Sequence, residues 1–271
     1  MRLATCYLLP LSATIPAMEQ STILLLEELA ANAWPPLITQ HLDGWRLRAS
    51  EGVHGRANSV WPNADHGTLP LAEKLAEAEA FYQRRDLPPR YQIAPTMQPA
   101  ELDQHLAERG YELYEPVEVQ TAVLPTLLAQ TNSPYTATIT PASSEEWLTF
   151  DNHHHAHTPH QAHIRGQIMR HIGPAAAFAA VHDDDGRILG IGLGVCERGW
   201  LGIFNMLTDL EERRKGVGTA VLHHLATWAT HHQATHAYLQ VVATNRPAQA
   251  LYARAGFTYA YSYHYRLKRL P

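Results

Sequence analysis

The chain has little cysteine, little net charge and no long apolar run. Its two cysteines in 271 residues, Cys6 and Cys196, lie far apart, which disfavours a disulfide framework or a thiolate metal site and favours a reducing cytoplasm. The formal net charge is −5 and the isoelectric point is near 6.4, so the basic footprint of a nucleic-acid-binding domain is missing. No segment is apolar over the roughly 20 residues that a membrane-spanning helix needs. We therefore expect a cytoplasmic protein that binds neither nucleic acid nor membrane.

What the chain does contain is enough apolar sequence for a large buried core. The hydrophobic content is 45%, and the length suggests one large domain or two ordinary ones. Residues 1–17 stand apart as a leader or a mis-assigned start. They faintly resemble a signal peptide, but the apolar run is short and is broken by Pro10 and Pro16. The alternative is that Met18 is the natural start, followed by a helix that Ser21 caps.

The most informative segment is residues 211–220, with the sequence EERRKGVGTA. It lies between an expected strand, Trp200 to Thr208, and an expected amphipathic helix, Thr219 to His231. Two glycines one residue apart let the backbone turn tightly and approach a ligand. The following helix offers unpaired N–H groups and the positive end of its dipole. The segment predicts a phosphate or pyrophosphate site, against the simpler interpretation of a helix start with a basic, solvated first turn.

Neither common phosphate loop fits this segment. The pattern G-x-x-x-x-G-K-[ST] is absent, and the dinucleotide pattern G-x-G-x-x-G would need a third glycine at Val221. The pattern that fits is R-x-x-G-x-G, formed by Arg213, Gly216 and Gly218. It resembles the pyrophosphate loop of the GNAT superfamily of acyl-CoA-dependent N-acetyltransferases.

A second motif supports the same resemblance. Residues 237–242 read as a short buried strand rich in β-forming residues. The pattern N-x-x-A-x-x-L-Y-x-x-x-G-F then runs from Asn245 to Phe257 and resembles the GNAT ending, at the expected distance after the glycine loop. The core of the resemblance covers roughly residues 135–270 and implies a mixed, mostly antiparallel sheet that splays between its fourth and fifth strands.

The resemblance also implies roles for individual residues. Acetyl-CoA would be the donor, with its pantetheine arm between the splayed strands and its pyrophosphate on the N–H groups of the glycine loop. Tyr252 would protonate the leaving thiolate, against the simpler interpretation of a helix tyrosine packed on the sheet. Asn245 would contact the cofactor, or it is only a turn or N-cap residue. The other cofactor-binding candidates are Met206, Leu207, Thr208, Arg213, Arg214, Lys215, Gly216, Val217, Gly218 and Thr219.

The general base is harder to assign. Some relatives carry a glutamate near the position of Leu201, and this chain has none there. A water chain, Asn205 or a histidine would serve, unless the amine binds already neutral. The histidine-rich run from Asp151 to His163 is solvated or structural, lines the acceptor wall, or holds a metal; we expect no metal, because the order of a zinc-protease motif is missing. On the helix after the loop, burial is expected for Val221, Leu222, Leu225 and Trp228, and exposure for His223, His224, His231 and His232.

The first half reads as a degenerate copy of the same fold. PAELDQHLAERGY echoes PAQALYARAGF, each a helix, a Gly-aromatic pair and a strand. Three motifs, N-A-W-P, D-G-W-x-L-R and R-A-N-S-V (Arg56 to Val60), resemble the leading region of a group of bacterial GNAT proteins. The R-x-x-G-x-G loop is absent here, so we expect no cofactor. Elements expected in this half are strands at Trp45–Arg48, Ala57–Trp61 and Tyr91–Ile93, helices at Leu71–Arg84 and Pro99–Arg109, and a linker at Thr126–Pro141.

The sequence thus predicts an α/β (α+β) protein of two GNAT-like domains, each a mixed, mostly antiparallel sheet flanked by helices. Residues 18–130 form the degenerate domain and residues 131–271 the catalytic one. The expected reaction moves an acetyl group from acetyl-CoA to a primary amine of a small molecule by direct attack. A protein or peptide amine, and a non-catalytic acyl-CoA-binding sensor, remain alternatives. The first half either closes the acceptor pocket or forms a homodimer interface.

Overall fold

The computed structural model describes residues 18–65 and 67–269. The leader or start expected within residues 1–17, and Cys6 with it, lie outside this part of the chain. Within it, no helix is long and apolar enough to cross a membrane.

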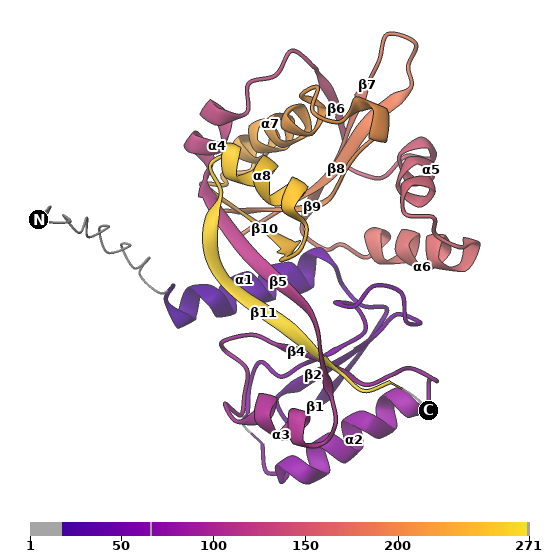
Figure 1. The fold of residues 1–271 in the computed structure, drawn as a ribbon, viewed down its shortest axis with the longest axis vertical. Helices are drawn as coiled ribbons and strands as arrows, with labels where there is room; N and C mark the ends of the chain where they lie inside the picture. Colours follow the sequence, from indigo (N-terminus) through magenta and orange to yellow (C-terminus); the bar gives the residue numbers. More distant parts are fainter. Residues whose placement is uncertain (1–17, 66, 270–271) are drawn as a thin grey trace, which may run out of the picture.

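Helices and strands are interspersed along the chain (Figure 1). The α-helices are α1 (Gln20–Ala33), α2 (Leu71–Gln83), α3 (Leu102–Glu108), α4 (Leu124–Gln130), α5 (Glu145–His154), α6 (Pro159–Arg170), α7 (Val217–His231) and α8 (Arg246–Arg254). The strands are β1 (Ile38–Leu42), β2 (Trp45–Ala49), β3 (Val60–Trp61), β4 (Arg90–Ile93), β5 (Glu112–Val123), β6 (Ala137–Thr140), β7 (Ala175–His182), β8 (Ile188–Glu197), β9 (Trp200–Thr208), β10 (His236–Val242) and β11 (Thr258–Leu267).

All strands join one sheet in the order β1-β2-β3-β4-β11-β5-β10-β9-β8-β7-β6. Two pairs in it are parallel, β3 with β4 and β9 with β10, and the others are antiparallel. The same pattern therefore occurs twice, because β2, β3 and β4 repeat the arrangement of β8, β9 and β10. The fold is the mixed, mostly antiparallel α/β architecture that the sequence predicts, with two GNAT-like units.

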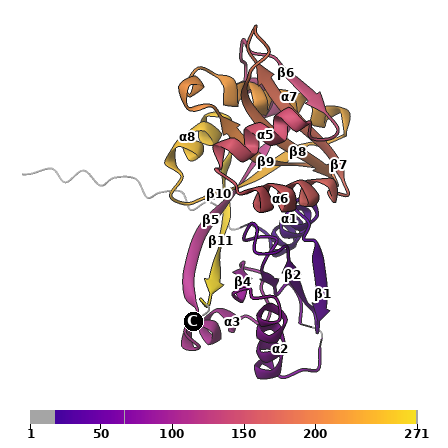
Figure 2. The ribbon, with the colours of Figure 1, turned by 90° about the vertical axis from the view of Figure 1, so that its right-hand side faces the viewer.

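The two units exchange their last strands. β5 belongs to the first half but pairs with β10, from His236↔Val123 to Val242↔Val117. β11 ends the second half but pairs with β4, from His264↔Ile93 to Leu267↔Arg90. Both strands run from one unit to the other in two perpendicular views (Figures 1 and 2). We propose residues 18–130 and 131–271 as the two repeats. Because of the strand exchange, the sheet runs continuously across the boundary between them.

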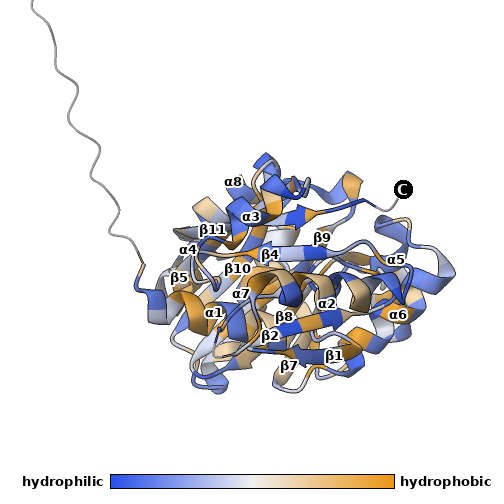
Figure 3. Ribbon diagram, turned by 90° about the horizontal axis from the view of Figure 1, so that it is seen from below, coloured by the Kyte–Doolittle hydropathy of each residue, from blue (hydrophilic) through white to orange (hydrophobic). Residues whose placement is uncertain are grey.

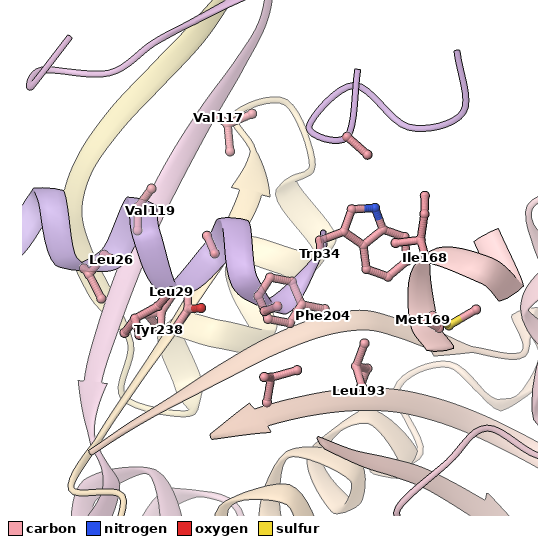
Figure 4. Close-up of a cluster of buried hydrophobic side chains, with 14 of the residues drawn as sticks. Leu26, Leu29, Trp34, Val117, Val119, Ile168, Met169, Leu193, Phe204 and Tyr238 are labelled. Carbon is pink, nitrogen blue, oxygen red and sulfur yellow. The ribbon is translucent and has the colours of Figure 1, made fainter. Parts of the chain in front are cut away.

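A shared hydrophobic core joins the halves. α1 packs on the sheet of the second half, so that Leu26 and Leu29 share one buried cluster with Phe204 and Tyr238 (Figure 4). Two further clusters lie under α7 in the second half and under α2 in the first. The helices carry both hydrophobic and hydrophilic residues (Figure 3), as expected for helices with one buried face. Burial between the halves fixes their relative position.

The second half follows the expected elements closely. β9 has the predicted bounds, and Ser144 caps α5 by accepting a hydrogen bond from the Trp147 N–H at 3.1 Å. The helix after the glycine loop buries Val221, Leu222 and Leu225, as predicted.

Four expectations need correction. α1 begins at Gln20 after Glu19, without the side-chain cap expected from Ser21. The expected linker contains α4, because Leu124 and Leu127 bury against the core despite the polar composition around them. The expected strand over 57–61 shrinks to β3, because a polar turn occupies its beginning.

The fourth correction concerns α7. His223 and His224 are half-buried, because residues 131–135 cross that face of the helix. The His223 Nδ1 lies 3.3 Å from the Thr131 Oγ1, and the His224 Nε2 lies 3.4 Å from the Tyr135 carbonyl oxygen. His231 and His232 are exposed, as predicted, and Trp228 is only partly buried.

Candidate active site

The sheet parts between β9 and β10. Their parallel pairing ends at Leu239↔Ile203, yet β9 continues to Thr208 and β10 to Val242. Just beyond that point β9 bulges, since Asn205 has φ +46° and the register with β8 shifts. The edge of β9 from Phe204 to Thr208 therefore faces β10 without pairing to it. This is the splay that the sequence predicts, and it leaves main-chain groups free for a ligand.

A pocket of about 240 Å³ lies where the two strands part. It brings together four of the predicted site residues, Asn205, Met206, Asn245 and Tyr252. Three others, Leu207, Thr208 and Arg213, line a separate pocket of about 480 Å³ beside His153 and His154.

The glycine loop takes the geometry that its sequence requires. Gly216 is the N-cap of α7 with φ +101°, a value that other residues rarely adopt. Because α7 starts at Val217, the N–H groups of its first turn have no carbonyl partner within the helix. An added Cβ at Gly218 would lie 3.2 Å from a Leu251 methyl group and 3.5 Å from the Thr208 hydroxyl oxygen. The absence of a side chain at Gly218 thus lets the start of the helix pack closely against Leu251 and Thr208.

The predicted cations of the loop differ in their surroundings. The Lys215 ammonium donates to Glu212 at 3.1 Å, so a neighbouring carboxylate partly balances its charge. Arg213 and Arg214 make no ion pair with a residue that the structure describes, and Arg214 adopts φ +63°. These two guanidinium groups are the ones available to a phosphate.

Tyr252 presents a protonated hydroxyl to the pocket. The side chain is buried, and this burial raises the pKa of Tyr252 to about 12. The hydroxyl makes no hydrogen bond within residues 18–65 and 67–269, so it is free to donate to a ligand. A phenol with this pKa is neutral at pH 7 and can act as a donor.

The two asparagines of the pocket are held differently. The Asn245 side chain caps α8 by accepting from the Ala248 N–H at 3.3 Å, so the N-cap interpretation is correct, and the residue lines the pocket as well. The Asn205 Nδ2 is buried and has no hydrogen-bond partner among the described residues. A buried, unpartnered amide in a pocket is a natural contact for a ligand.

The first half supplies pocket residues that the sequence did not single out, although closing the acceptor pocket was one of the two roles expected of this half. Trp34, His54 and Arg56 line the same pocket as Tyr252. Trp34 is the C-cap residue of α1, and His54 and Arg56 lie in the turn between β2 and β3. The N-A-W-P and R-A-N-S-V motifs contain Trp34 and Arg56, and they were the only sequence signal for this wall.

Asn58 shapes the turn that carries His54 and Arg56. Its Oδ1 accepts from the N–H groups of Ser50 at 2.7 Å and Gly52 at 2.9 Å. Its Nδ2 donates to the carbonyl oxygens of Val53 at 2.7 Å and His54 at 2.9 Å. One buried amide thus satisfies four backbone groups, which explains why this turn replaces the expected strand.

His54 is the one residue lining this pocket whose unperturbed pKa lies near neutrality. Its ring lies 5.1 Å from the Trp34 ring. The residue is exposed to solvent, even though protein atoms pack around its ring. Partial desolvation, together with the guanidinium groups of Arg56 and Arg165, lowers the pKa of His54 well below its usual value. The imidazole is therefore neutral at pH 7 and can accept a hydrogen bond.

The histidine-rich run forms part of the neighbouring wall. Ligand atoms of Asp151, His155 and His157 lie within 4.8 Å of one another. However, Asp151 is fully buried and binds the Arg165 guanidinium at 2.9–3.2 Å. The guanidinium also lies 5.1 Å from the Trp34 ring. The carboxylate is therefore already satisfied as a structural partner.

A sheet that parts beside a glycine-capped helix is the fold of the GNAT acyltransferases. Among solved structures, a GCN5-related N-acetyltransferase from Kribbella flavida superposes with a TM-score of 0.68 at 14% identity, over 92% of this chain and 96% of that one. A tandem GNAT protein from the clavulanic acid biosynthesis pathway superposes with a TM-score of 0.58 at 14% identity, over 73% of this chain and 69% of that one. At these identities the superpositions show the fold alone.

Sequence comparison gives the family. The family described as "Probable histone acetyltransferase Rv0428c C-terminal" matches residues 20–266. The "Uncharacterized N-acetyltransferase YobR" of Bacillus subtilis (strain 168) is 32% identical over 246 residues, which cover 90% of this chain and 98% of that protein. The chain belongs to this family and is an acyl-CoA-dependent acetyltransferase of the GNAT superfamily.

Proposed function

We propose that this enzyme transfers an acetyl group from acetyl-CoA to a primary amine of a small molecule. The observation that carries the proposal is the pocket at the splay of β9 and β10, where the Tyr252 hydroxyl and the unpartnered Asn205 amide meet. The pocket is small, and Trp34, His54 and Arg56 of the first half wall it in. This enclosure favours a small amine over a protein substrate.

The donor fits the second half. The free edge of β9 from Met206 to Thr208 offers main-chain groups to the amides of a pantetheine arm. The N–H groups of residues 214–219 face a pyrophosphate, with Arg213 and Arg214 as counter-charges. The glycine cap of α7 and the unpartnered Asn205 are the features that support this fit.

The residues of the pocket divide the proton chemistry. The amine must lose a proton as it attacks the thioester carbonyl carbon, and the neutral His54 is placed to accept it. The main-chain N–H groups near Leu207 and Thr208 polarise the carbonyl oxygen. Because the Tyr252 pKa of about 12 exceeds the roughly 8.5 of a free thiol, we assign Tyr252 a hydrogen bond to the leaving sulfur as its charge develops.

Charge and cysteine usage favour a cytoplasmic reaction. Cys196 is a buried thiol that pairs with no cysteine in the described part of the chain, which suits a reducing compartment.

Thiol release with a panel of amines tests the proposal. Small primary amines should give acetyl-CoA-dependent thiol release, and lysine-containing peptides should give much less. Faster turnover of the peptides would indicate that the acceptor is an amine of a protein or peptide and would contradict the proposal. Acetyl-CoA binding without turnover of any amine would support a non-catalytic sensor and contradict the proposal.

A further inference from the structure

A second cavity adjoins the proposed active site and extends it toward the first half. Its volume is about 400 Å³, and it shares His54, Arg56 and Gln240 with the pocket at the splay. Its other walls include Arg90 of β4 and tyrosines of β5 and β11. An amine at His54 would therefore have the rest of its molecule in this second cavity.

Arg56 enters both cavities and forms no ion pair with any residue that the structure describes. The residue is 8% exposed, and its guanidinium carbon lies 5.6 Å from the centre of the Phe204 ring. It donates to the Gln240 side-chain oxygen and, at 3.5 Å, to the Tyr263 hydroxyl. Its Nε is buried and has no hydrogen-bond partner among the described residues. Neutral groups hold this cation in place and leave donors free.

Arg90 repeats the arrangement across the cavity. Its guanidinium carbon lies 5.5 Å from the Tyr114 ring and 5.6 Å from the Tyr265 ring. The guanidinium packs against Gly55, where an added Cβ would collide with it. Its Nε is likewise buried without a partner in the described chain. Aromatic faces therefore orient this second cation as well.

Two other withdrawn arginines have carboxylate partners, and the buried Arg48 has neutral partners at its Nε and Nη2. Arg165 binds Asp151, and Arg266 binds Asp103 at 2.7 Å. Within residues 18–65 and 67–269, neither Arg56 nor Arg90 has a carboxylate oxygen within 4.0 Å. The half-buried Glu115 is the one acid that lines this cavity, so the cavity keeps a positive balance. A withdrawn, unpaired cation is costly, and an anionic ligand would relieve that cost.

We propose that the acceptor amine carries an anionic group, a carboxylate or a phosphate, that binds between Arg56 and Arg90. This inference rests on the proposed acetyl transfer, because it places the amino end of the same molecule at His54. A planar guanidinium donates two parallel hydrogen bonds to either kind of oxyanion. Arg56 and Arg90 are then specificity residues that set affinity for the acceptor.

Matched pairs of amines test the inference by calorimetric binding to the protein saturated with CoA. β-Alanine against β-alaninamide probes a carboxylate, and O-phosphoethanolamine against ethanolamine probes a phosphate. Saturation with CoA keeps the glycine loop from binding the phosphate. At least one probe with an anionic group should bind about tenfold or more tightly than the counterpart that lacks this group, which is the range expected of charge-assisted hydrogen bonds.

Two variants link that preference to the cavity. Arg90→Gln should abolish the roughly tenfold difference in affinity within the matched pair of amines. The dissociation constant for acetyl-CoA should stay unchanged. Arg84→Gln, at an exposed arginine that ends α2, makes the same charge change away from the cavity and should keep the preference.

The outcomes separate this inference from the proposed function. Failure of acetyl-CoA to bind would overturn the proposed function. Normal acetyl-CoA binding with equal affinity within both pairs, including no binding by either member, would overturn the anionic acceptor alone. A preference that survives Arg90→Gln would also overturn it, because the anion would then bind elsewhere.

Discussion

The two repeats start their equivalent helices in opposite ways. α7 follows a basic segment, begins after a glycine in the left-handed region and has no acidic residue in its first turn. α2 begins after Pro70 and carries Glu73 in its first turn. Just before α2, the Asp43 carboxylate accepts from the N–H groups of Thr68 at 3.0 Å and Leu69 at 3.1 Å. The Asp43 carboxylate thus lies against main-chain N–H groups just before α2, whereas basic side chains come just before α7.

The strands beside these helices differ in the same sense. β9 continues five residues past its last pair with β10, to Thr208, whereas β3 ends at Trp61, directly after its pair Val60↔Tyr91. The first half therefore has no long free edge for a ligand. In its place it provides a shaped turn and two aromatic-bound arginines. We propose that duplication left one repeat suited to the donor and the other to the acceptor.

Loss of the Tyr252 hydroxyl should have the largest effect on turnover. Tyr252→Phe should lower kcat about 100-fold, the scale of one lost donor at a developing charge, with acetyl-CoA affinity kept. Steady-state thiol release and calorimetry measure the two quantities. Tyr259→Phe, at a tyrosine that is 46% exposed, should change neither. An unchanged kcat in Tyr252→Phe would place the chemistry elsewhere.

The turn of the first half should matter for the acceptor and for stability. Asn58→Ala leaves buried backbone groups without partners, so the free energy of unfolding should fall by about 3 kcal/mol. KM for the amine should rise about tenfold, while acetyl-CoA affinity holds in the folded fraction. Asn58→Asp keeps the oxygen that accepts from the backbone N–H groups. Its free energy of unfolding and its KM for the amine should therefore lie between those of the wild type and of Asn58→Ala. Equal loss of donor and acceptor binding would contradict the division between the repeats.

His54 should have a smaller effect with a distinct pH signature. Because the pKa of His54 is lowered, its neutral form persists below pH 6.5, and the acidic fall of kcat/KM should lie below that value. His54→Gln should lower kcat about tenfold, a small effect for acid–base catalysis because the base is weak, and should remove that acidic limb. His231→Gln, at an exposed histidine, serves as the control. A limb that remains in His54→Gln would assign it to another group.

Much of the second half could be predicted because its signals are local. Gly216 needs a left-handed conformation, and Tyr252 belongs to a helix that starts at a recognisable cap. The wall from the first half could not be predicted in this way. Arg56 contacts Gln240, 184 residues away, across an exchanged strand. The prediction of a linker at α4 was wrong because the surrounding sequence is polar, although two leucines of this helix are buried. Contacts between distant residues, more than local propensities, complete this site.

Calorimetric titration with acetyl-CoA is the most direct test of the division between the repeats. The wild type should bind one molecule per chain with micromolar affinity. Gly218→Glu places bulk and negative charge at the start of α7 and should abolish binding. Gly173→Glu is the matched control, because nothing lies within 4 Å of an added Cβ there and φ is not positive. Two sites per chain, or binding that survives Gly218→Glu, would contradict the assignment of the donor to the second half alone.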